Sequence, residues 1–216
     1  MIKSRYKKLD VFYLDEKHVK RERFHATNEL WNRRGFNNPK EIGHTMSLVR
    51  SRRWEKKEDW MNWYYSNVIS YNKIESVAKQ LKKDLAAEGI RYSDLETKEI
   101  CFFRIIGETW NGFIRETETI KLLELRKPSW IFKLTDAEKD IGLGVDAECF
   151  EDGKLVGAVQ VKPHSFYRRI KHNAPAYVNF VNKIRKYQDR YPVTVYVIFS
   201  KMNGEIISHI TYPPNP

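Results

Sequence analysis

The chain has 216 residues, 41% of them hydrophobic, and only 10 glycines and 8 prolines, a composition that excludes a largely disordered or collagen-like protein. Lys and Arg outnumber Asp and Glu by 39 to 28, and the resulting net charge of +11 favours a polyanionic partner, nucleic acid above all. The sequence has no secretory signal and no membrane-spanning apolar run, so we expect a cytoplasmic protein without a membrane partner.

Basic and aromatic side chains are mixed in the first part of the chain. Residues 1–60 carry 16 basic and 9 acidic side chains, and the tryptophans among or just beyond them are Trp31, Trp54, Trp60 and Trp63. This mixture is typical of a nucleic-acid surface. Tryptophans that only pack inside a basic protein would explain it equally well, and composition leaves both interpretations open.

The first half of the chain is predicted to be mainly helical. Apolar residues recur at helical spacing in three segments, 55–66, 68–88 and 95–106. We expect the second helix to end at Gly89 and the third at Gly107, because glycine readily adopts the left-handed conformation that ends many helices.

A fourth amphipathic helix is predicted over 113–125. At about 100° per residue, Phe113, Ile120 and Leu123 fall on one face, and Glu116 lies within their arc. A carboxylate on an apolar stripe is costly unless a cation or a donor compensates it. Glu116 is therefore a candidate functional residue, although a glutamate at the rim of the stripe that reaches water would give the same pattern.

Beyond Pro128, short apolar runs alternate with turns, so the second half is predicted to be α/β. The expected strands are 144–150, 155–161, 193–199 and 206–212, with a helix over 173–190. Cys101 and Cys149 lie in apolar segments without partners at zinc-ligand spacing, and we expect both to be buried free thiols in a reducing compartment.

The first two of these strands are predicted to form a hairpin. If Asp152 to Lys154 form a three-residue loop, the register pairs Glu151 with Leu155, Glu148 with Ala158 and Asp146 with Gln160. The hairpin therefore brings polar side chains from both strands level with one another.

Four of these polar side chains share one face of the hairpin. Because side chains alternate along a strand, Gln160 and Lys162 lie on the face that also holds Asp146 and Glu148. The valines that flank Gln160 must face the core, which predicts that the polar face points outward. A surface hairpin with ordinary polar alternation is the alternative.

This group could hold Mg²⁺, which prefers oxygen ligands. The expected ligands are the Asp146 carboxylate, the Gln160 side-chain oxygen and the Val161 backbone carbonyl, with Glu116 completing the set. One or two such ions can neutralise charge on a phosphoryl group, activate water and stabilise a leaving oxygen. Lys162 could orient the attacking water, or help to deprotonate it if its pKa is lowered.

The pattern resembles the core of the PD-(D/E)XK nucleases. An aspartate, thirteen intervening residues and Gln-x-Lys on a hairpin, preceded by a helix with an inward glutamate, are similar to that core. The usual ligand before the lysine is Asp or Glu, so Gln160 departs from the pattern, although some restriction enzymes of this superfamily carry an amide there. The resemblance implies an α/β fold with a central mixed five-stranded sheet flanked by helices.

A more specific resemblance is to the MjaI-type restriction endonucleases. Four parts of the chain occur in the order and approximate spacing of that family: 38–47 (NPKEIGHTMS), 60–65, 111–116, and 145–146 with 160–163. The resemblance implies a Mg²⁺-dependent type II restriction endonuclease that cuts double-stranded DNA at a short, CTAG-like palindrome. It also implies a homodimer and a DNA methyltransferase that belongs to the same system but is not a bound subunit.

We expect a single domain over 1–216. A helical elaboration, 1–107, would contact DNA or a second copy, and the nuclease core would follow over 108–216. The candidate DNA contacts are Lys40, His44, Arg50, Arg52, Arg53, His164, Arg168, Arg169 and Lys171. A solvated charged helix face would explain the N-terminal arginines nearly as well.

Two other functions stay open. A repair or junction-resolving nuclease on the same core would recognise DNA shape and cut without a fixed sequence. A non-catalytic nucleic-acid binder, in which Gln160 marks a decayed metal site, would bind DNA without Mg²⁺-dependent nicking. Discrete plasmid fragments would exclude the first, and a Lys162→Ala variant with an unchanged phenotype would favour the second.

Overall fold

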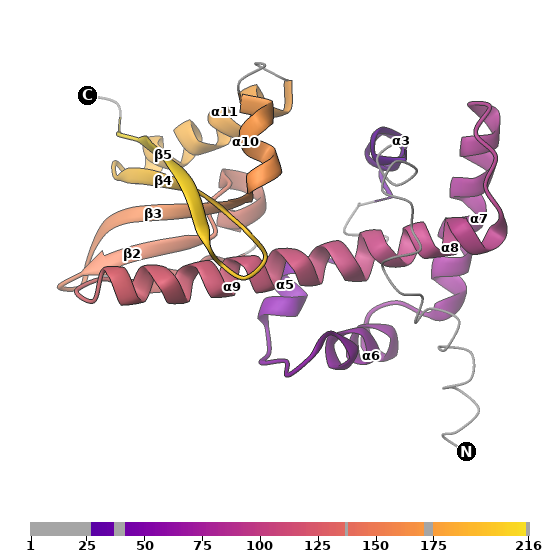
Figure 1. Ribbon diagram of the computed structural model, residues 1–216, viewed down its shortest axis with the longest axis horizontal. Coiled ribbons are helices and arrows are strands. Elements are labelled where there is room, and N and C mark those ends of the chain that lie inside the picture. Colours follow the sequence, from indigo (N-terminus) through magenta and orange to yellow (C-terminus); the bar gives the residue numbers. More distant parts are fainter. Residues whose placement is uncertain (1–26, 37–41, 137, 171–174, 215–216) are drawn as a thin grey trace. The chain divides into compact units, whose positions relative to one another are not determined.

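The computed structural model describes residues 27–36, 42–136, 138–170 and 175–214. The chain divides into two compact units, Met1–Trp110 and Asn111–Pro216 (Figure 1). The boundary between them lies within one long helix, α9 (Glu108–Arg126). Among the helices described, none is long and apolar enough to cross a membrane.

The described part of the first unit is helical, as predicted. Its elements are α3 (Asn28–Arg33), α5 (Thr45–Arg50), α6 (Lys57–Asn67), α7 (Tyr71–Ala87), α8 (Asp94–Phe102) and a π-helical turn, η2 (Phe103–Gly107). Trp60 and Tyr64 lie one turn apart on α6 and are fully buried, and the Tyr64 hydroxyl donates to the Ile42 carbonyl at 2.6 Å. This unit therefore has an apolar core of its own.

Gly89 and Gly107 have different roles. Gly89 has a φ of +78°, and its N–H donates to the Ala86 carbonyl at 3.1 Å, so it ends α7 as predicted. The prediction that Gly107 ends a helix is wrong, because α8 continues through η2 directly into α9. A Cβ at Gly107 would lie 2.7 Å from the Phe103 ring, so this glycine makes room for the ring inside a continuous helical segment.

A five-stranded mixed sheet is the centre of the second unit. Its strands are β1 (Ile131–Leu134), β2 (Ala147–Glu151), β3 (Lys154–Pro163), β4 (Thr194–Ser200) and β5 (Ile206–Tyr212), in spatial order 1-2-3-4-5. β3 and β4 are parallel, and the other neighbours are antiparallel. Two helices, α10 (His164–Ile170) and α11 (Pro175–Arg190), make the crossover that parallel pairing requires. The predicted α/β class is confirmed.

Helices cover both faces of this sheet, α9 on one side and α11 on the other (Figure 1). The α11 side is a cluster that includes Val145, Ala158, Phe180, Ile184, Tyr187, Val195, Val197 and Phe199. The α9 side is a cluster of Ile120, Ala147, Cys149, Val159, Val161 and Ile198. The predicted outward-pointing face of the hairpin is therefore wrong: Val159 and Val161 face one buried layer, and the opposite face lies against a second.

The β2–β3 turn is shorter than predicted. Glu151 pairs with Lys154, so the turn has two residues, Asp152 and Gly153, with φ values of 49° and 75°. Positive φ at both positions is the type I′ geometry that joins tightly twisted strands. The predicted three-residue loop and the pairing of Glu151 with Leu155 are wrong.

A local irregularity restores the predicted register farther along the hairpin. The pairing shifts between Cys149 and Phe150, which face Gly157 and Leu155, so β3 carries one additional residue there. Glu148 consequently opposes Ala158, as predicted. The two deviations compensate for each other before the strands reach the candidate site.

Candidate active site

Asp146 lies just before β2 and is held by backbone hydrogen bonds on two sides. Its N–H donates to the Val159 carbonyl at 2.8 Å, and its carbonyl accepts from the Thr135 N–H at 3.0 Å. The residue is 1% exposed. The backbone of Asp146 is thus held by β3 and by the segment that follows β1.

The Asp146 carboxylate extends the hydrogen bonding between β2 and β3 by one position before β2 begins. Ala147 pairs with Val159, and the next position of this ladder is taken by Asp146 Oδ2, which accepts from the Val161 N–H at 2.7 Å. The same oxygen accepts a hydrogen bond from Gln160 Nε2. Gln160 is 2% exposed, and its Nε2 also lies 3.4 Å from the Val161 carbonyl oxygen. One amide nitrogen is therefore shared by a carboxylate and a backbone carbonyl.

This arrangement fits a hard cation. The Asp146 carboxylate oxygen and the Val161 carbonyl oxygen both accept from the Gln160 amide nitrogen, and the oxygen of the same amide is the third oxygen of this cluster. Carboxylate, amide and backbone oxygens are the ligands that Mg²⁺ accepts. Over the described residues, no group of three or more His, Cys, Asp or Glu side chains could hold a metal ion. A cation here would consequently rely on one carboxylate and on neutral oxygens.

Lys162 lies on the same face of the sheet, two residues beyond Gln160. Its side chain is half-buried, and Nζ lies 5.6 Å from the centre of the Phe180 ring on α11. An ammonium is attracted to the face of an aromatic ring, so this contact holds Lys162 against α11. Gln160 and Lys162 thus lie on the face of the sheet that α11 covers.

Glu116 lies on the helix that covers the other face. It is half-buried, one turn before Thr119 and Ile120 on α9. The Thr119 hydroxyl is hydrogen-bonded to the Ser200 hydroxyl at 2.8 Å, and Ser200 pairs with Pro163 at the end of β3. Glu116 therefore lies toward the end of the sheet at which β3 terminates. Its role as a ligand stays a prediction.

Glu148 has a set of partners that sequence reasoning missed. Lys139 Nζ donates to both carboxylate oxygens, at 2.8 and 2.9 Å, and the Tyr187 hydroxyl donates to Oε1 at 2.8 Å. The hydrogen bond to Glu148 raises the pKa of Lys139, and burial, then Glu148, raises the pKa of Tyr187. Lys139 is thus a cation and Tyr187 a neutral donor at neutral pH. Nothing in the sequence around Lys139 signalled this contact.

A family model described as MjaI restriction endonuclease matches residues 26–208. The chain belongs to this family. The match includes Glu116, Asp146, Gln160 and Lys162, and it assigns the protein to the restriction endonucleases. The resemblance predicted from short motifs is thereby confirmed. Neither a curated protein nor a solved structure matches the chain.

In this MjaI-family endonuclease, the N-terminal basic residues predicted to contact DNA belong to the first unit. Lys40 lies outside the described residues; His44, Arg52 and Arg53 are exposed, and Arg50 is half-buried. The Arg52 guanidinium lies 4.6 Å from the centre of the Trp63 ring. Trp31 and Trp60 are buried, whereas Trp54 and Trp63 are half-buried and in contact. Two of the four tryptophans therefore pack, and two form a basic and aromatic surface with Arg52.

The remaining predicted contacts follow β3 directly. His164 is the first residue of α10, is exposed, and stacks on Tyr167 with 6.4 Å between the ring centres. Arg168 and Arg169 belong to the same helix, and Lys171 lies outside the described residues. α10 therefore begins two residues after Lys162.

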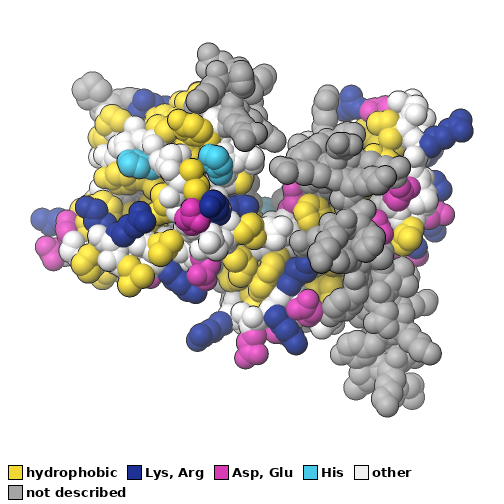
Figure 2. All heavy atoms as spheres, in the orientation of Figure 1, with side chains coloured by type: hydrophobic (Ala, Val, Ile, Leu, Met, Phe, Trp, Pro, Cys, Tyr) yellow, Lys and Arg dark blue, Asp and Glu magenta, His cyan; other side chains and the backbone are white. Residues whose placement is uncertain are grey.

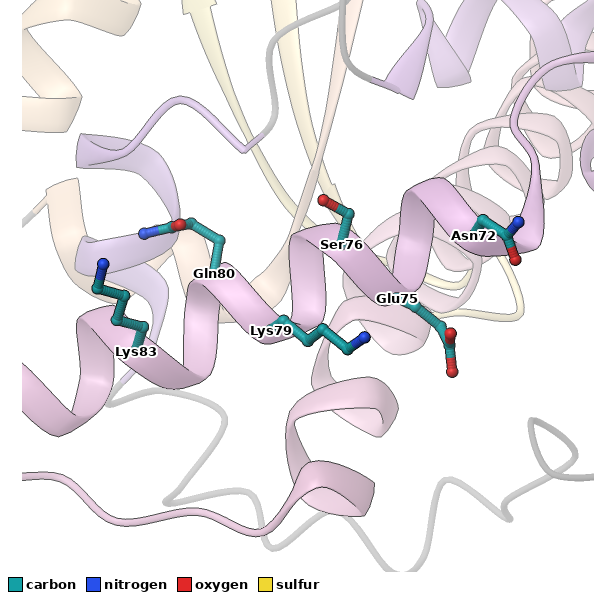
Figure 3. A pocket seen from close by; sticks show the side chains of 6 residues that line it. All are labelled: Asn72, Glu75, Ser76, Lys79, Gln80 and Lys83. Carbon is teal, nitrogen blue, oxygen red and sulfur yellow. The ribbon is translucent and has the colours of Figure 1, made fainter.

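The described residues present a face of mixed charge and, in the first unit, a hollow. On the face shown in Figure 2, the described Lys and Arg side chains are interspersed with Asp and Glu. A hollow of about 500 Å³ along α7 is lined by Asn72, Glu75, Ser76, Lys79, Gln80 and Lys83 (Figure 3). All six come from one helix, and Lys98 already binds Glu75 at 2.5 Å. The hollow includes none of the predicted site residues.

Proposed function

We propose that the protein is a Mg²⁺-dependent type II restriction endonuclease that hydrolyses phosphodiester bonds of double-stranded DNA at a short palindromic site. Family membership supports the reaction class. Metal dependence is supported by one observation, the convergence of Asp146 Oδ2 and the Val161 carbonyl on the amide of buried Gln160. A buried carboxylate close to a backbone carbonyl offers the kinds of oxygen ligand that Mg²⁺ binds.

Each residue of the site has a proposed role. Asp146, Gln160 and Val161 bind the ion through oxygen, and Glu116 binds it directly or through water. A bound Mg²⁺ supplies neutralisation of phosphate charge and a water of lowered pKa. Lys162 orients that water toward the phosphorus, and its position against Phe180 limits the approach of bulk solvent to the ammonium.

The nucleic-acid partner is double-stranded DNA, bound by the basic and imidazole residues of both units. The proposed contacts are Lys40, His44, Arg50, Arg52, Arg53, His164, Arg168, Arg169 and Lys171. A palindrome presents two symmetry-related phosphates, so a two-fold homodimer would place one site at each strand. The cognate DNA methyltransferase would act separately on the same sequence.

The test is to incubate the purified protein with plasmid DNA and Mg²⁺, and to sequence the fragment ends. The proposal predicts discrete fragments that share one palindromic sequence at every end, and intact plasmid when EDTA replaces Mg²⁺. Nicks at unrelated sequences would instead support a repair or junction-resolving nuclease. Retarded but uncut plasmid in Mg²⁺ would support a non-catalytic binder with a decayed metal site.

A further inference from the structure

The carboxylate of Glu148 joins three elements of the second unit. It lies on β2, it is 9% exposed, and it receives donors from Lys139 on the π-helical turn η3 (Glu138–Gly142) and from Tyr187 on α11. A buried carboxylate needs such donors, because its charge is otherwise uncompensated. Each of its two oxygens is occupied by the Lys139 ammonium.

Lys139 in turn holds the backbone that carries Asp146. Its carbonyl accepts from the Val145 N–H at 3.2 Å, and its own N–H donates to Asp136 Oδ1 at 3.0 Å. The Thr135 hydroxyl also donates to the Val145 carbonyl. Residues 139–146 therefore form a closed loop, and the Lys139–Glu148 ion pair fastens the start of this loop to β2.

Tyr187 connects the same carboxylate to the helix beneath Lys162. Phe180, whose ring lies 5.6 Å from Lys162 Nζ, precedes Tyr187 by seven residues, so the two aromatic side chains lie on one face of α11. Both belong to the apolar cluster on that side of the sheet. A shift of α11 would therefore displace the surface on which Lys162 rests.

We propose that Glu148 is a positioning residue for the nuclease reaction: through Lys139 it fixes the loop that ends in Asp146, and through Tyr187 it fixes the helix beneath Lys162. Glu148 does not bind the metal ion. This inference rests on the proposed function, because it concerns the placement of that function's residues. Residues that orient a metal ligand commonly change activity by about 10- to 100-fold when they are replaced.

The competing role for Glu148, that of a metal ligand, gives an opposite expectation for Lys139. If Glu148 were a ligand, its ion pair with Lys139 would compete with the metal, and removing the ammonium would strengthen metal binding. If Glu148 acts through Lys139, removing either partner loosens the same loop. The two substitutions would then have similar effects that do not add.

The experiment is a double-mutant cycle on the full chain with Glu148→Gln, Lys139→Met and the combined variant. Four properties are measured: single-turnover cleavage of a plasmid in Mg²⁺, DNA affinity in Ca²⁺, the rise in Tm on adding Ca²⁺, and the circular dichroism spectrum. We expect each single variant to cleave on the order of 10- to 100-fold more slowly, with unchanged DNA affinity and spectrum. The combined variant should be no slower than the slower single variant.

Two further variants separate positioning from general stability. Lys139→Arg keeps the cation and should restore most of the cleavage rate that Lys139→Met loses. The exposed Lys201–Glu205 ion pair, 2.9 Å long in the β4–β5 turn, is the matched control, and Lys201→Met with Glu205→Gln should leave cleavage unchanged. A lower Tm in Lys139→Met with an undiminished cleavage rate would overturn the proposal.

Failure of this inference can be distinguished from failure of the proposed function. A wild-type protein that does not cleave DNA in Mg²⁺ overturns both. A wild-type protein that cleaves, together with a Lys139→Met variant that responds more strongly to Ca²⁺, overturns the positioning role alone and makes Glu148 a ligand. Additive losses in the combined variant also overturn it.

Discussion

The backbone of Gly204 packs directly against the backbone of Glu118. Gly204 lies in the turn between β4 and β5, and a Cβ at this position would lie 2.5 Å from the Glu118 carbonyl carbon and 2.7 Å from its oxygen. Its φ of +79° also favours glycine. Glu118 belongs to α9, so this turn sets how closely α9, which carries Glu116, approaches the sheet.

Gly204→Ala is expected to destabilise the second unit by about 2 to 4 kcal/mol, because it combines a strained φ with overpacking against a helix backbone. Gly153→Ala is the matched control: its φ is +75°, but a Cβ there meets nothing within 4 Å. The control should lose only about 1 kcal/mol. Urea denaturation midpoints measure both losses, and equal losses would contradict the close approach.

Gln160→Glu is expected to make stability depend on divalent cations. The substitution replaces the donor to Asp146 Oδ2 with a second carboxylate, so repulsion should lower Tm in EDTA. Mg²⁺ or Ca²⁺ should restore Tm and give a larger rise than in the wild type, since two carboxylates bind the ion more strongly than one. A Tm that ignores divalent cations would contradict a cation site at this position.

Lys162→Ala is expected to reduce the single-turnover cleavage rate by about 10²-fold or more, the usual range for a group that handles the attacking water. Stability should change little, because the side chain is only half-buried. Lys154→Ala, an exposed lysine at the start of the same strand, serves as the control and should cleave at the wild-type rate. Equal rates for the two variants would remove Lys162 from the site.

The two cysteines are expected to be unreactive in the folded protein. Burial raises the pKa of Cys149 to about 12, and burial also raises the pKa of Cys101. At pH 8 neither thiol therefore forms the thiolate that attacks a disulfide reagent. A dithiobis-nitrobenzoate assay should release little product from native protein and two equivalents in denaturant. The two cysteines lie in different units, so fast reaction of only one thiol would indicate that one unit opens while the other stays folded.

The register of the β2–β3 hairpin shows what a sequence can and cannot predict. Alternation placed Asp146 and Gln160 side by side, and that pairing survived a wrong turn length because the irregularity at Phe150 added one residue. Turn type depends on backbone dihedral angles, and the sequence Asp152-Gly153-Lys154 is compatible with both a two-residue and a three-residue turn. Periodicity is therefore more reliable near the middle of a strand than at its turn.

Tertiary contacts account for the features that the sequence did not predict. Glycine commonly ends a helix, but Gly107 lies inside a continuous helical segment, where it leaves room for the Phe103 ring. The polar face of the hairpin is buried because α11 packs against it. Periodicity predicts that this helix exists, but it does not predict which face of the sheet the helix covers. Glu148 finds Lys139 and Tyr187 at separations of 9 and 39 residues, and no local pattern signals such partners.

The most direct test of the account compares Asp146→Asn with Asp152→Asn. Asparagine can still accept from the Val161 N–H, so the fold should persist, but the only carboxylate among Asp146, Gln160 and Val161 is lost. We predict that Asp146→Asn abolishes Mg²⁺-dependent cleavage of plasmid DNA and the Tm rise in Ca²⁺, while Asp152→Asn in the exposed turn retains both. Mg²⁺-dependent cleavage at the wild-type rate by folded Asp146→Asn would contradict it.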